Sequence, residues 1–531
     1  MSLLDSGGYL GVPDGSSVVL RVVGYAMSAL FLSVVANIVW QMLPRGKSEP
    51  PMVFHWIPFI GNAVSYGIDP FRFYTDCRKK HGDVFTFMLF GQRMTVFLGI
   101  KGNEFILNGK LQDVNAEEIY GPLTTPVFGR NIIYDCPNSK LMEQKKFIKF
   151  GLTQSALHTY VQLIEKEVLD YIKTAPAFKG QSGTVNIPAA MAEITIFTAG
   201  RALQGEEVRR KLTAEFADLY HDLDLGFRPI NFLVPWAPLP QNRRRDIAHA
   251  KMASIYVDII NRRRQSGKRP SEEDPDMDMI WHLMGCVYKD GRPVPDLEIA
   301  HMMITLLMAG QHSSSSSSSW IMLRLASRPD LVEELYEEQI NNLGAGSRSK
   351  AVLEPLRYED VDRLPLLQSV VRETLRVHSS IHSLMRKVKN PMPVPGSDYV
   401  ITPDKVLVAS PIVTHLDEAY FANALVWNPH RWIDNVEVES EGDMDMVDYG
   451  YGVVSKGTRS PYLPFGAGRH RCIGEKFAHV NLVTIISTMV RHFKFNTVDG
   501  RSWVPPTDYT SLFSRPMQPA EIRWERRFPE E

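Results

Sequence analysis

The sequence predicts a mainly α-helical protein with small β-sheets, preceded by a single transmembrane helix at its N-terminus. Three observations support this fold class. An uncharged apolar segment lies at 22–43, long helical patterns fill most of the chain after it, and short strand-like runs such as KVLVASPIV (405–413) separate them. The composition is globular, with 44% hydrophobic and 22% charged residues. A net charge of −1 gives no electrostatic reason to expect nucleic acid binding, which calls for a basic domain.

The segment 22–43, VVGYAMSALFLSVVANIVWQML, predicts a membrane anchor. At 1.5 Å per residue it spans roughly 33 Å, about the thickness of the hydrocarbon core of a bilayer. The alternatives are a cleaved signal peptide, which has a shorter apolar region and a small-residue cleavage site, and a buried helix. Arg21 precedes the segment while Arg45 and Lys47 follow it, so positive charge decides the orientation only weakly. We place the large domain on the cytoplasmic side.

Four prolines, at 44, 50, 51 and 58, follow the apolar segment and predict a stiff connector, because proline cannot continue a helix. We therefore expect residues 1–48 to form the anchor with a basic, proline-containing hinge. Residues 49–531 form one large domain, since no internal repeat or second linker divides them. The polar stretch 262–278 and the acidic stretch 436–448 predict exposed loops, and the acidic one is also a weak candidate for a docking site.

The cysteines are few and scattered, which excludes a disulfide framework and a zinc site and indicates a reducing context. They are Cys77, Cys136, Cys286 and Cys472. A cysteine with a function must therefore act alone.

The strongest chemical signal surrounds one of these cysteines, in PFGAGRHRCIGEKFAHVNLVTIISTMV (464–490). The residues that fit the spacing F-x-x-G-x-x-x-C-x-G are Phe465, Gly468, Cys472 and Gly474. Glycines let the backbone turn tightly and approach a flat cofactor closely. The cysteine stands directly before an amphipathic helix, whose N–H groups and dipole lower the pKa of a thiol. Nearby positive charge, from Arg469, His470 and Arg471, should lower it further.

This segment resembles the haem-binding loop of the cytochromes P450. The resemblance implies the cytochrome P450 fold and a haem-thiolate catalytic domain over residues 49–531. The implied cofactor is haem b, iron protoporphyrin IX, with the Cys472 thiolate as the axial ligand of the iron. Such a ligand donates electron density that favours O–O cleavage. The alternative is an inert buried cysteine after a glycine-rich turn, and the complete motif argues against it.

A pair of opposite charges agrees with this resemblance. Glu373 and Arg376, in RETLRVH, are three residues apart and share one helical face. Such pairs are common on surface helices, but this one precedes the cysteine and is followed by NPHRW (428–432). The resemblance implies that Glu373, Arg376 and Arg431 form a buried scaffolding network behind the haem. Such a network needs every member, since one unpaired buried charge is costly.

Seven consecutive serines, 313–319, predict part of a buried helix although serine runs usually mark linkers. Apolar sequence flanks the run on both sides. Asp296 and Glu298 suit a helix start and Pro329 a stop. Seven serines in place of alanine cost about 3 kcal/mol of helix propensity. Burial of the flanks offsets that cost, and the hydroxyls can bond back to the carbonyl four residues earlier.

The resemblance implies that this helix crosses the oxygen-binding face of the haem, where the family usually carries an acid followed by threonine. This sequence departs from that pattern and has His312 followed by Ser313. Histidine transfers protons near neutral pH, and a serine hydroxyl can position dioxygen or water. The alternative is an ordinary buried histidine. The sequence GQHS is typical of one branch, the sterol 14α-demethylases, in which Asp224 matches an acid that pairs with the histidine.

The segment YGPLTTPVFGRNIIYDCPN (120–138) resembles the first substrate-recognition segment of that branch, in its fungal members. The resemblance implies that Tyr120, Tyr134 and Lys145 bind the haem propionates or line the cavity, and that Arg386 and His470 complete the set of propionate partners. It implies a sterol cavity lined by Leu123, Thr124, Phe128, Ile133, Phe227, Phe232, Ala309, Ile381, His382, Ser383 and Met517. Most of these residues are apolar, as a cavity for a rigid sterol requires, and His382 is a candidate partner for the sterol hydroxyl.

The implied activity is removal of the 14α-methyl group of lanosterol or of its 24-methylene relative, eburicol, in ergosterol biosynthesis. Three oxidations use dioxygen and NADPH, release formate and leave a 14,15 double bond. Expected partners are NADPH-cytochrome P450 reductase, cytochrome b5 as a second electron donor, azole inhibitors and the endoplasmic reticulum membrane. A basic rim at Arg469, Arg471 and Lys476 is the candidate docking surface for an acidic electron donor.

Two other functions stay open from the sequence. One is hydroxylation of a different steroid or lipid by a membrane monooxygenase of the same fold, although the segments YGPLTTPVFG and GQHS argue against it. The other is a haem-binding sensor or carrier without turnover, which needs no proton path.

Overall fold

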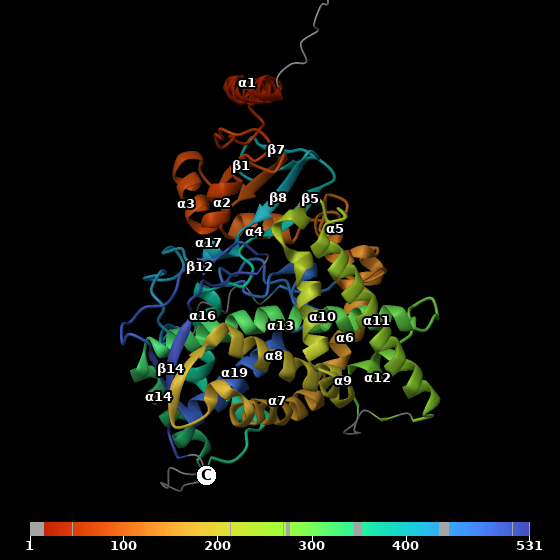
Figure 1. Cartoon of the computed structure of the whole chain (residues 1–531), viewed down its shortest axis with the longest axis vertical. Helices are drawn as coiled ribbons and strands as arrows, with labels where there is room; N and C mark the ends of the chain where they lie inside the picture. The colour runs from red at the N-terminus through yellow and green to blue at the C-terminus, as the bar shows by residue number, and fades with distance from the viewer. Residues whose placement is uncertain are drawn as a thin grey trace, which may run out of the picture.

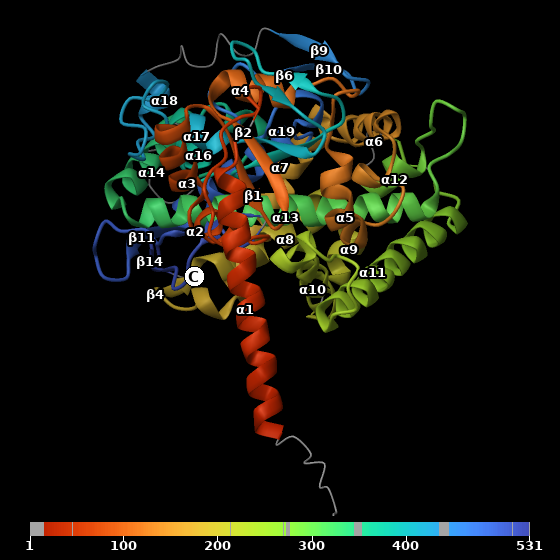
Figure 2. The ribbon, with the colours of Figure 1, turned by 90° about the horizontal axis from the view of Figure 1, so that it is seen from above.

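The computed structural model describes residues 15–44, 46–212, 214–268, 270–271, 277–344, 353–434, 445–511 and 513–529. Its first helix, α1 (Gly15–Met42), projects away from the rest of the chain (Figure 2). The segment Val19–Met42 is long and apolar enough to cross a membrane, and its most apolar window is only 6% buried. The apolar segment expected at 22–43 is therefore an exposed helix rather than a core helix.

The proline-containing connector after α1 is not helical, as its prolines require. It is nevertheless held at both ends. Gln41, in the last turn of α1, exchanges two hydrogen bonds with the backbone of His55, at 2.8 and 3.0 Å. Farther along, the Val53 N–H donates to the carbonyl of Thr86 at 2.7 Å. These bonds attach the base of the anchor helix to the first strand of the domain.

Helices form most of the domain, and small sheets lie beside them (Figure 1). The helices after α1 are α2 (Ala63–Ile68), α3 (Pro70–His81), α4 (Gly99–Leu107), α5 (Glu117–Phe128), α6 (Asn138–Gly151), α7 (Gln154–Thr174), α8 (Ile187–Gln204), α9 (Glu206–Lys211), α10 (Ala214–Asp224), α11 (Pro240–Gln265), α12 (Met279–Met284), α13 (Asp296–Ala326), α14 (Pro329–Leu343), α15 (Tyr358–Val361), α16 (Pro365–Val377), α17 (Pro411–His415), α18 (Arg431–Asp434) and α19 (Glu475–His492). The prediction of a mainly helical fold with small sheets is confirmed.

The largest sheet has the strand order β1-β2-β8-β5-β3, in which β2 and β8 are parallel and the other neighbours antiparallel. Its strands are β1 (Val84–Leu89), β2 (Gln92–Phe97), β8 (Lys405–Ala409), β5 (Leu384–Val388) and β3 (Val114–Asn115). A second sheet has the order β11-β14-β4, formed by β11 (Phe493–Thr497), β14 (Glu521–Arg526) and β4 (Ser182–Asn186). Three two-stranded ladders pair β10 (Val453–Ser455) with β9 (Met446–Asp448), β12 (Thr507–Asp508) with β13 (Arg515–Pro516), and β6 (Met392–Pro393) with β7 (Val400–Ile401).

The long helix α13 crosses the middle of the molecule below the large sheet (Figure 1). It begins at Asp296 and ends before Pro329, as the sequence predicts. It packs against α8, α11, α16 and α19, so apolar side chains cover it on several sides and most of its residues after Glu298 are buried. This burial explains why a helix with seven serines is stable despite its low propensity.

The serine run lies inside α13 and is not a linker. The hydroxyls of Ser313, Ser318 and Ser319 donate to the carbonyls four residues earlier, at 2.9, 2.7 and 2.5 Å. These bonds satisfy buried hydroxyls within the helix itself, as expected. Ser316 and Ser317 instead reach groups outside the helix.

Three expectations about short segments need correction. In 405–413, strand β8 ends at Ala409, and α17 starts at Pro411 because proline suits the first turn of a helix. The stretch 262–278 begins as the last turn of α11, and residues 269 and 272–276 lie outside the described residues. Of the acidic stretch 436–448, residues 436–444 lie outside the described residues, while 446–448 form strand β9 rather than a loop.

Candidate active site

The cysteine-containing loop connects a short 3-10 helix, Gly468–His470, to the N-terminus of α19. Gly468 has φ +68°, and a Cβ there would lie 2.3 Å from the carbonyl oxygen of Leu107. Only glycine therefore lets the loop pass so close to α4. The Cys472 N–H donates to the carbonyl of Phe465 at 3.0 Å, which closes the turn, and the Cys472 side chain stays exposed.

The expected lowering of the thiol pKa is not what the structure shows. The Cys472 side chain keeps solvent-accessible surface, but protein atoms packed around it remove water from the thiolate, and this desolvation is the largest effect and raises the pKa of Cys472. The N–H of Gly474 and the charge of Arg471 do lower the pKa, as predicted from the sequence, and Lys145, which the prediction did not include, lowers it too, but their sum is smaller. The sequence reveals the helix terminus and the cations but not the depth of the loop. A cation bound at the sulfur would favour the thiolate.

Phenolic and cationic side chains form one connected group beside this loop. The rings of Tyr120 and Tyr134 lie 5.2 Å apart, and Tyr134 and His470 lie 5.9 Å apart. Burial raises the pKa of Tyr120, while the charge of Arg386 lowers it in part. Burial, followed by the charges of Arg386 and Lys145, keeps the pKa of His470 well below its usual value. Four of the five predicted propionate partners are thus brought together.

Lys145 belongs to the same region but bonds differently from the expectation. Its ammonium donates to the carbonyls of Arg469 and Arg471, at 2.7 and 3.0 Å, and so braces the cysteine loop. Burial lowers its pKa to about 7.

The charges of this group fit the haem that the sequence predicts. Arg386 is 5% exposed, and among the described residues no carboxylate lies within ion-pair distance of it. Its hydrogen bond goes to the carbonyl of Met385, at 2.8 Å. A buried cation without an anion is costly, so an anionic ligand would stabilise this site. An exposed thiol on one side and an unneutralised arginine with two phenols on the other match the iron and the propionates of a haem.

The scaffolding network lies where α16 meets α18. Glu373 and Arg376 are fully buried and form a two-point ion pair, at 2.8 and 2.9 Å. Arg431 Nε lies 3.3 Å from the same carboxylate. The remaining donors of Arg376 bond to the carbonyls of His415 and Ala424, both at 2.6 Å. Every member has a partner, which is the condition for a stable buried charge network.

The proposed proton-transfer pair is brought together from distant parts of the sequence. His312 lies in the middle of α13 and Asp224 at the end of α10, and His312 Nε2 lies 3.1 Å from Asp224 Oδ1. Burial raises the pKa of the Asp224 carboxyl, but its interactions with His312, Arg515 and His221 together outweigh burial, and the pKa lies below its usual value. The Ser313 hydroxyl donates to the carbonyl of Ala309, so a ligand at Ser313 would meet its lone pairs.

The expected cavity residues fall into two groups. Leu123, Thr124, Phe128, Phe227 and Ser383 are buried, and the rings of Phe128 and Phe227 meet edge to face at 5.8 Å. Surface remains accessible on Ile133, Phe232, Ala309, Ile381, His382 and Met517, although Ala309 sits in the middle of a buried helix. The Ser383 hydroxyl contacts Tyr66, Tyr74 and His382 at 3.2, 2.9 and 2.8 Å, so Ser383 orients His382. Burial lowers the pKa of His382 to about 4.

The backbone of Ile133 is strained, with φ +48°, which is rare for a β-branched residue. Its N–H donates to Gln144 Oε1 at 3.2 Å, which helps to hold this conformation. Strain of this kind concentrates at binding sites, and the position of Ile133 at the substrate stays a prediction.

Two residues beside His312 were missed from the sequence. The ring of Phe513 stacks on His312 at 5.2 Å and 16°, and the ring of Tyr220 lies 5.6 Å away. The Tyr220 hydroxyl donates to Gln311 Oε1 at 2.5 Å. Phe513 stands in an irregular segment without periodicity, which gives no signal. The helical spacing of Tyr220 and Asp224, four residues apart, could have identified Tyr220.

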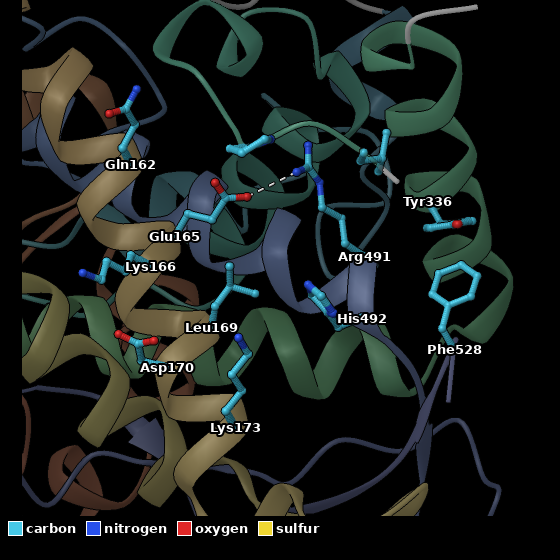
Figure 3. Close-up of a pocket in the computed structure, with 12 residues that line it drawn as sticks. Gln162, Glu165, Lys166, Leu169, Asp170, Lys173, Tyr336, Arg491, His492 and Phe528 are labelled. Atoms are coloured by element: carbon cyan, nitrogen blue, oxygen red, sulfur yellow. Dashed lines mark hydrogen bonds and ion pairs between the residues drawn. The ribbon is translucent and has the colours of Figure 1, made fainter. Parts of the chain in front are cut away.

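The molecule also has a cleft of about 810 Å³ between α7, α14 and α19 (Figure 3). Its lining contains none of the predicted site residues. Glu165 and Arg491 form an ion pair across it at 3.2 Å, and Arg491 also donates to Gln339 Oε1 at 2.7 Å. This ion pair therefore helps to hold α7 to α19.

Comparison with known proteins agrees with this geometry. The family model described as Cytochrome P450 matches residues 50–524. A sterol 14-alpha demethylase of Gibberella zeae is 67% identical over 503 residues, which cover 95% of this chain and 98% of that protein. One of Aspergillus flavus is 68% identical over 506 residues, covering 95% and 97%. An eburicol 14-alpha-demethylase of Penicillium italicum is 60% identical over 519 residues, covering 97% and 99%.

Among solved structures, the retinoic acid-bound cyanobacterial CYP120A1 has the same fold, with a TM-score of 0.73. It is 19% identical, and the match covers 91% of this chain and 100% of that one.

Proposed function

The chain belongs to the cytochrome P450 family and to its sterol 14α-demethylases, and we propose how its residues remove the 14α-methyl group. The substrate is lanosterol or eburicol. Three successive oxidations, each with dioxygen and two electrons from NADPH, convert the methyl group to formate and leave a 14,15 double bond. The near full-length similarity to fungal sterol and eburicol demethylases is the observation that carries this proposal.

Residues on two sides hold the cofactor. Cys472 would hold the haem iron through its thiolate, and Phe465 and the glycines of its loop would lie against the cofactor. Arg386, Tyr120, Tyr134 and His470 donate to the propionates, and Lys145 holds the cysteine loop in place. When bound, haem b activates dioxygen for insertion into a C–H bond. The Glu373 network fixes the loops behind it and has no part in the chemistry.

Protons reach the oxygen site through α13. The His312 imidazole takes a proton from the side of Asp224 and passes it toward Ser313, whose hydroxyl orients the reacting water or dioxygen. The distance of 3.1 Å between His312 and Asp224 supports this path as a close ion-pair contact. Its angle is not that of a hydrogen bond, so the imidazole must turn to align with the carboxylate before transfer. The carboxylate also stabilises the imidazolium that forms during transfer.

The sterol lies against apolar side chains of α5, η1 (Ile133–Asp135), η3 (Leu225–Phe227), η4 (Pro229–Phe232) and the C-terminal segment. His382 meets the 3-hydroxyl group, since its lowered pKa keeps the ring neutral and able to accept or donate one hydrogen bond. Azoles bind in the same space and block the iron.

The first 48 residues anchor the domain in the endoplasmic reticulum membrane, with residues 49–531 on the cytoplasmic side. Electrons come from NADPH-cytochrome P450 reductase or cytochrome b5 at the basic rim. Lys476 is exposed there, whereas Arg471 pairs with Glu475 at 2.9 Å and offers less charge to a partner. A docking surface of this kind weakens with salt.

Reconstitution with a reductase, NADPH and each sterol tests the proposal. A 14-demethylated diene, identified by mass spectrometry, supports it and ranks the two substrates. A hydroxylated sterol that keeps all its carbons would indicate a different monooxygenase of this fold. Sterol binding and a normal thiolate-haem carbon monoxide spectrum without product would indicate a carrier.

A further inference from the structure

One hydrogen bond of the serine run reaches the C-terminal segment of the chain. The hydroxyl of Ser316 donates to the carbonyl of Ser514, 198 residues away, at 2.6 Å. Both serines are buried, at 6% and 2% exposure. The hydroxyl of Ser514 in turn donates to the carbonyl of Ser379 at 2.8 Å, and its N–H to that of Ser380 at 2.9 Å. One residue of the C-terminal segment is thus tied to α13 and to the loop after α16.

The residue before this tie carries the aromatic ring that covers the proton-transfer histidine. Phe513 stacks on His312 with centroids 5.2 Å apart and planes at 16°, and it meets Phe227 edge to face at 6.0 Å. Because Ser514 is fixed by three hydrogen bonds, the backbone of its neighbour Phe513 has little freedom. Ser316 follows His312 by four residues in α13, so the two side chains lie on the same face of the helix.

We infer that Ser316 and Ser514 form a clamp that holds Phe513 over His312, so that Phe513 is a positioning residue keeping the imidazole within reach of Asp224. The inference rests on the proposed function, because the position of the imidazole affects the reaction only if His312 transfers protons.

Geometry shows why His312 needs such support. Its contact with Asp224 joins the tips of two side chains on different helices, and the His312 side chain is 17% exposed. On the other side, Tyr220 offers a ring, with its hydroxyl committed to Gln311. His221 and Arg515 are the other charged or titratable groups near Asp224. Without the stacked ring, the imidazole can rotate away, and a displacement of ~1 Å in a catalytic group costs on the order of 10²-fold in rate.

The serine run itself supplies a matched control. Ser318 is as buried as Ser316, but its hydroxyl donates to the carbonyl of Ser314 in the same helix, at 2.7 Å. Replacing Ser318 by alanine therefore removes a hydroxyl from the run without touching the clamp. A second pair isolates the ring: Phe513→Leu keeps an apolar side chain without the stack, and Phe513→Tyr restores the ring.

The test uses the full-length holoenzyme with Ser316→Ala, Ser318→Ala, both Phe513 variants and His312→Ala as reference. Hydrogen exchange of residues 513–517 should be at least about fivefold faster in Ser316→Ala and unchanged in Ser318→Ala. Peroxide released per NADPH with sterol bound should rise about tenfold in Ser316→Ala and Phe513→Leu and return toward wild type in Phe513→Tyr. The dissociation constant for sterol should change less than about twofold, since ground-state binding is retained.

Each deviation has a defined meaning. Equal exchange in Ser316→Ala and Ser318→Ala would overturn the clamp. Faster hydrogen exchange in Ser316→Ala, with wild-type peroxide release per NADPH in both Ser316→Ala and Phe513→Leu, would overturn the positioning role. Wild-type peroxide release per NADPH in His312→Ala would instead disprove the proton transfer of the proposed function. The hydrogen-exchange data would still show whether Ser316 and Ser514 form the clamp. Phe513→Leu leaves the hydrogen bonds of the clamp intact and keeps the test decisive if Ser316→Ala does not fold.

Discussion

Replacing Glu373 by glutamine should destabilise the protein more than any other single isosteric change in the site. The carboxylate accepts hydrogen bonds from Arg376 at 2.8 and 2.9 Å and from the Asn428 N–H at 2.9 Å. Trp432 Nε1 adds a further bond at 3.0 Å, and Arg431 approaches to 3.3 Å. Glutamine turns one acceptor oxygen into a donor that faces other donors, and it leaves Arg376, at 0% exposure, without a counter-charge.

Breaking a buried ion pair from one side costs about 3–5 kcal/mol. The whole free energy of unfolding of a domain is ~5–15 kcal/mol, so the variant should unfold at much lower urea and keep little haem after purification. Asp76→Asn is the control, because Asp76 is half-exposed, with Arg72 at 3.8 Å and Lys79 at 3.5 Å, and each of these surface pairs should contribute less than about 1 kcal/mol. A loss below about 1 kcal/mol in Glu373→Gln would refute the reasoning, because the network would then not be a stabilising element.

Further predictions concern pH, the propionate site and the anchor. Burial, then the charge of Arg376, lowers the pKa of His415 to about 3, and its Nε2 accepts from the Leu463 N–H at 2.7 Å. The folded state therefore disfavours the protonated ring, so this contribution to stability is complete above the unfolded pKa of about 6.5 and is lost as pH falls toward 3. The free energy of unfolding of the wild type, measured in urea, should fall by up to ~1.4 kcal/mol per pH unit in this window because of His415. The free energy of unfolding of His415→Gln should depend less steeply on pH, and equal pH dependence in the two proteins would contradict the assignment. Arg386→Met should stabilise the haem-free chain, since it removes an unneutralised buried cation, but should weaken haem retention at least about tenfold. Urea unfolding of the haem-free proteins measures the first effect, and haem titration measures the second. A chain that starts at residue 49 should leave the membrane fraction while its sterol-induced spectral shift stays unchanged, and flotation on vesicles measures this; retention on vesicles at wild-type level would mean that α1 is not the main anchor.

Much of the fold and of the haem loop follows from local sequence. The apolar segment 22–43, the ends of α13 at Asp296 and before Pro329, and the glycine and cysteine spacing around Cys472 depend on neighbours in sequence. Back-bonding of the serines is also a local property, and three of the hydroxyls show it. The pair of His312 with Asp224 was expected only through the family resemblance, since nothing in the sequence around Asp224 indicates its partner.

Properties that depend on the depth of packing or on irregular segments could not be predicted from the sequence. The raised thiol pKa of Cys472 comes from desolvation by the folded protein, whereas the cations near it in sequence predicted a lowered pKa. Phe513 meets His312 only because Ser514 is fixed to two other elements. Lys145 bonds to carbonyls of the cysteine loop, a contact across 324 and 326 residues that no spacing rule describes. Such long-range contacts are set by tertiary structure alone.

The most direct test of the central claim follows the carbon that leaves. Eburicol labelled with ¹³C in the 14α-methyl group is incubated with the full-length holoenzyme, a reductase and NADPH, and labelled formate and sterol are measured together with oxygen consumed. The account predicts one labelled formate per 14-demethylated diene, with three molecules of dioxygen used for each. Label that stays on the sterol as an alcohol or aldehyde at full consumption of oxygen would contradict it.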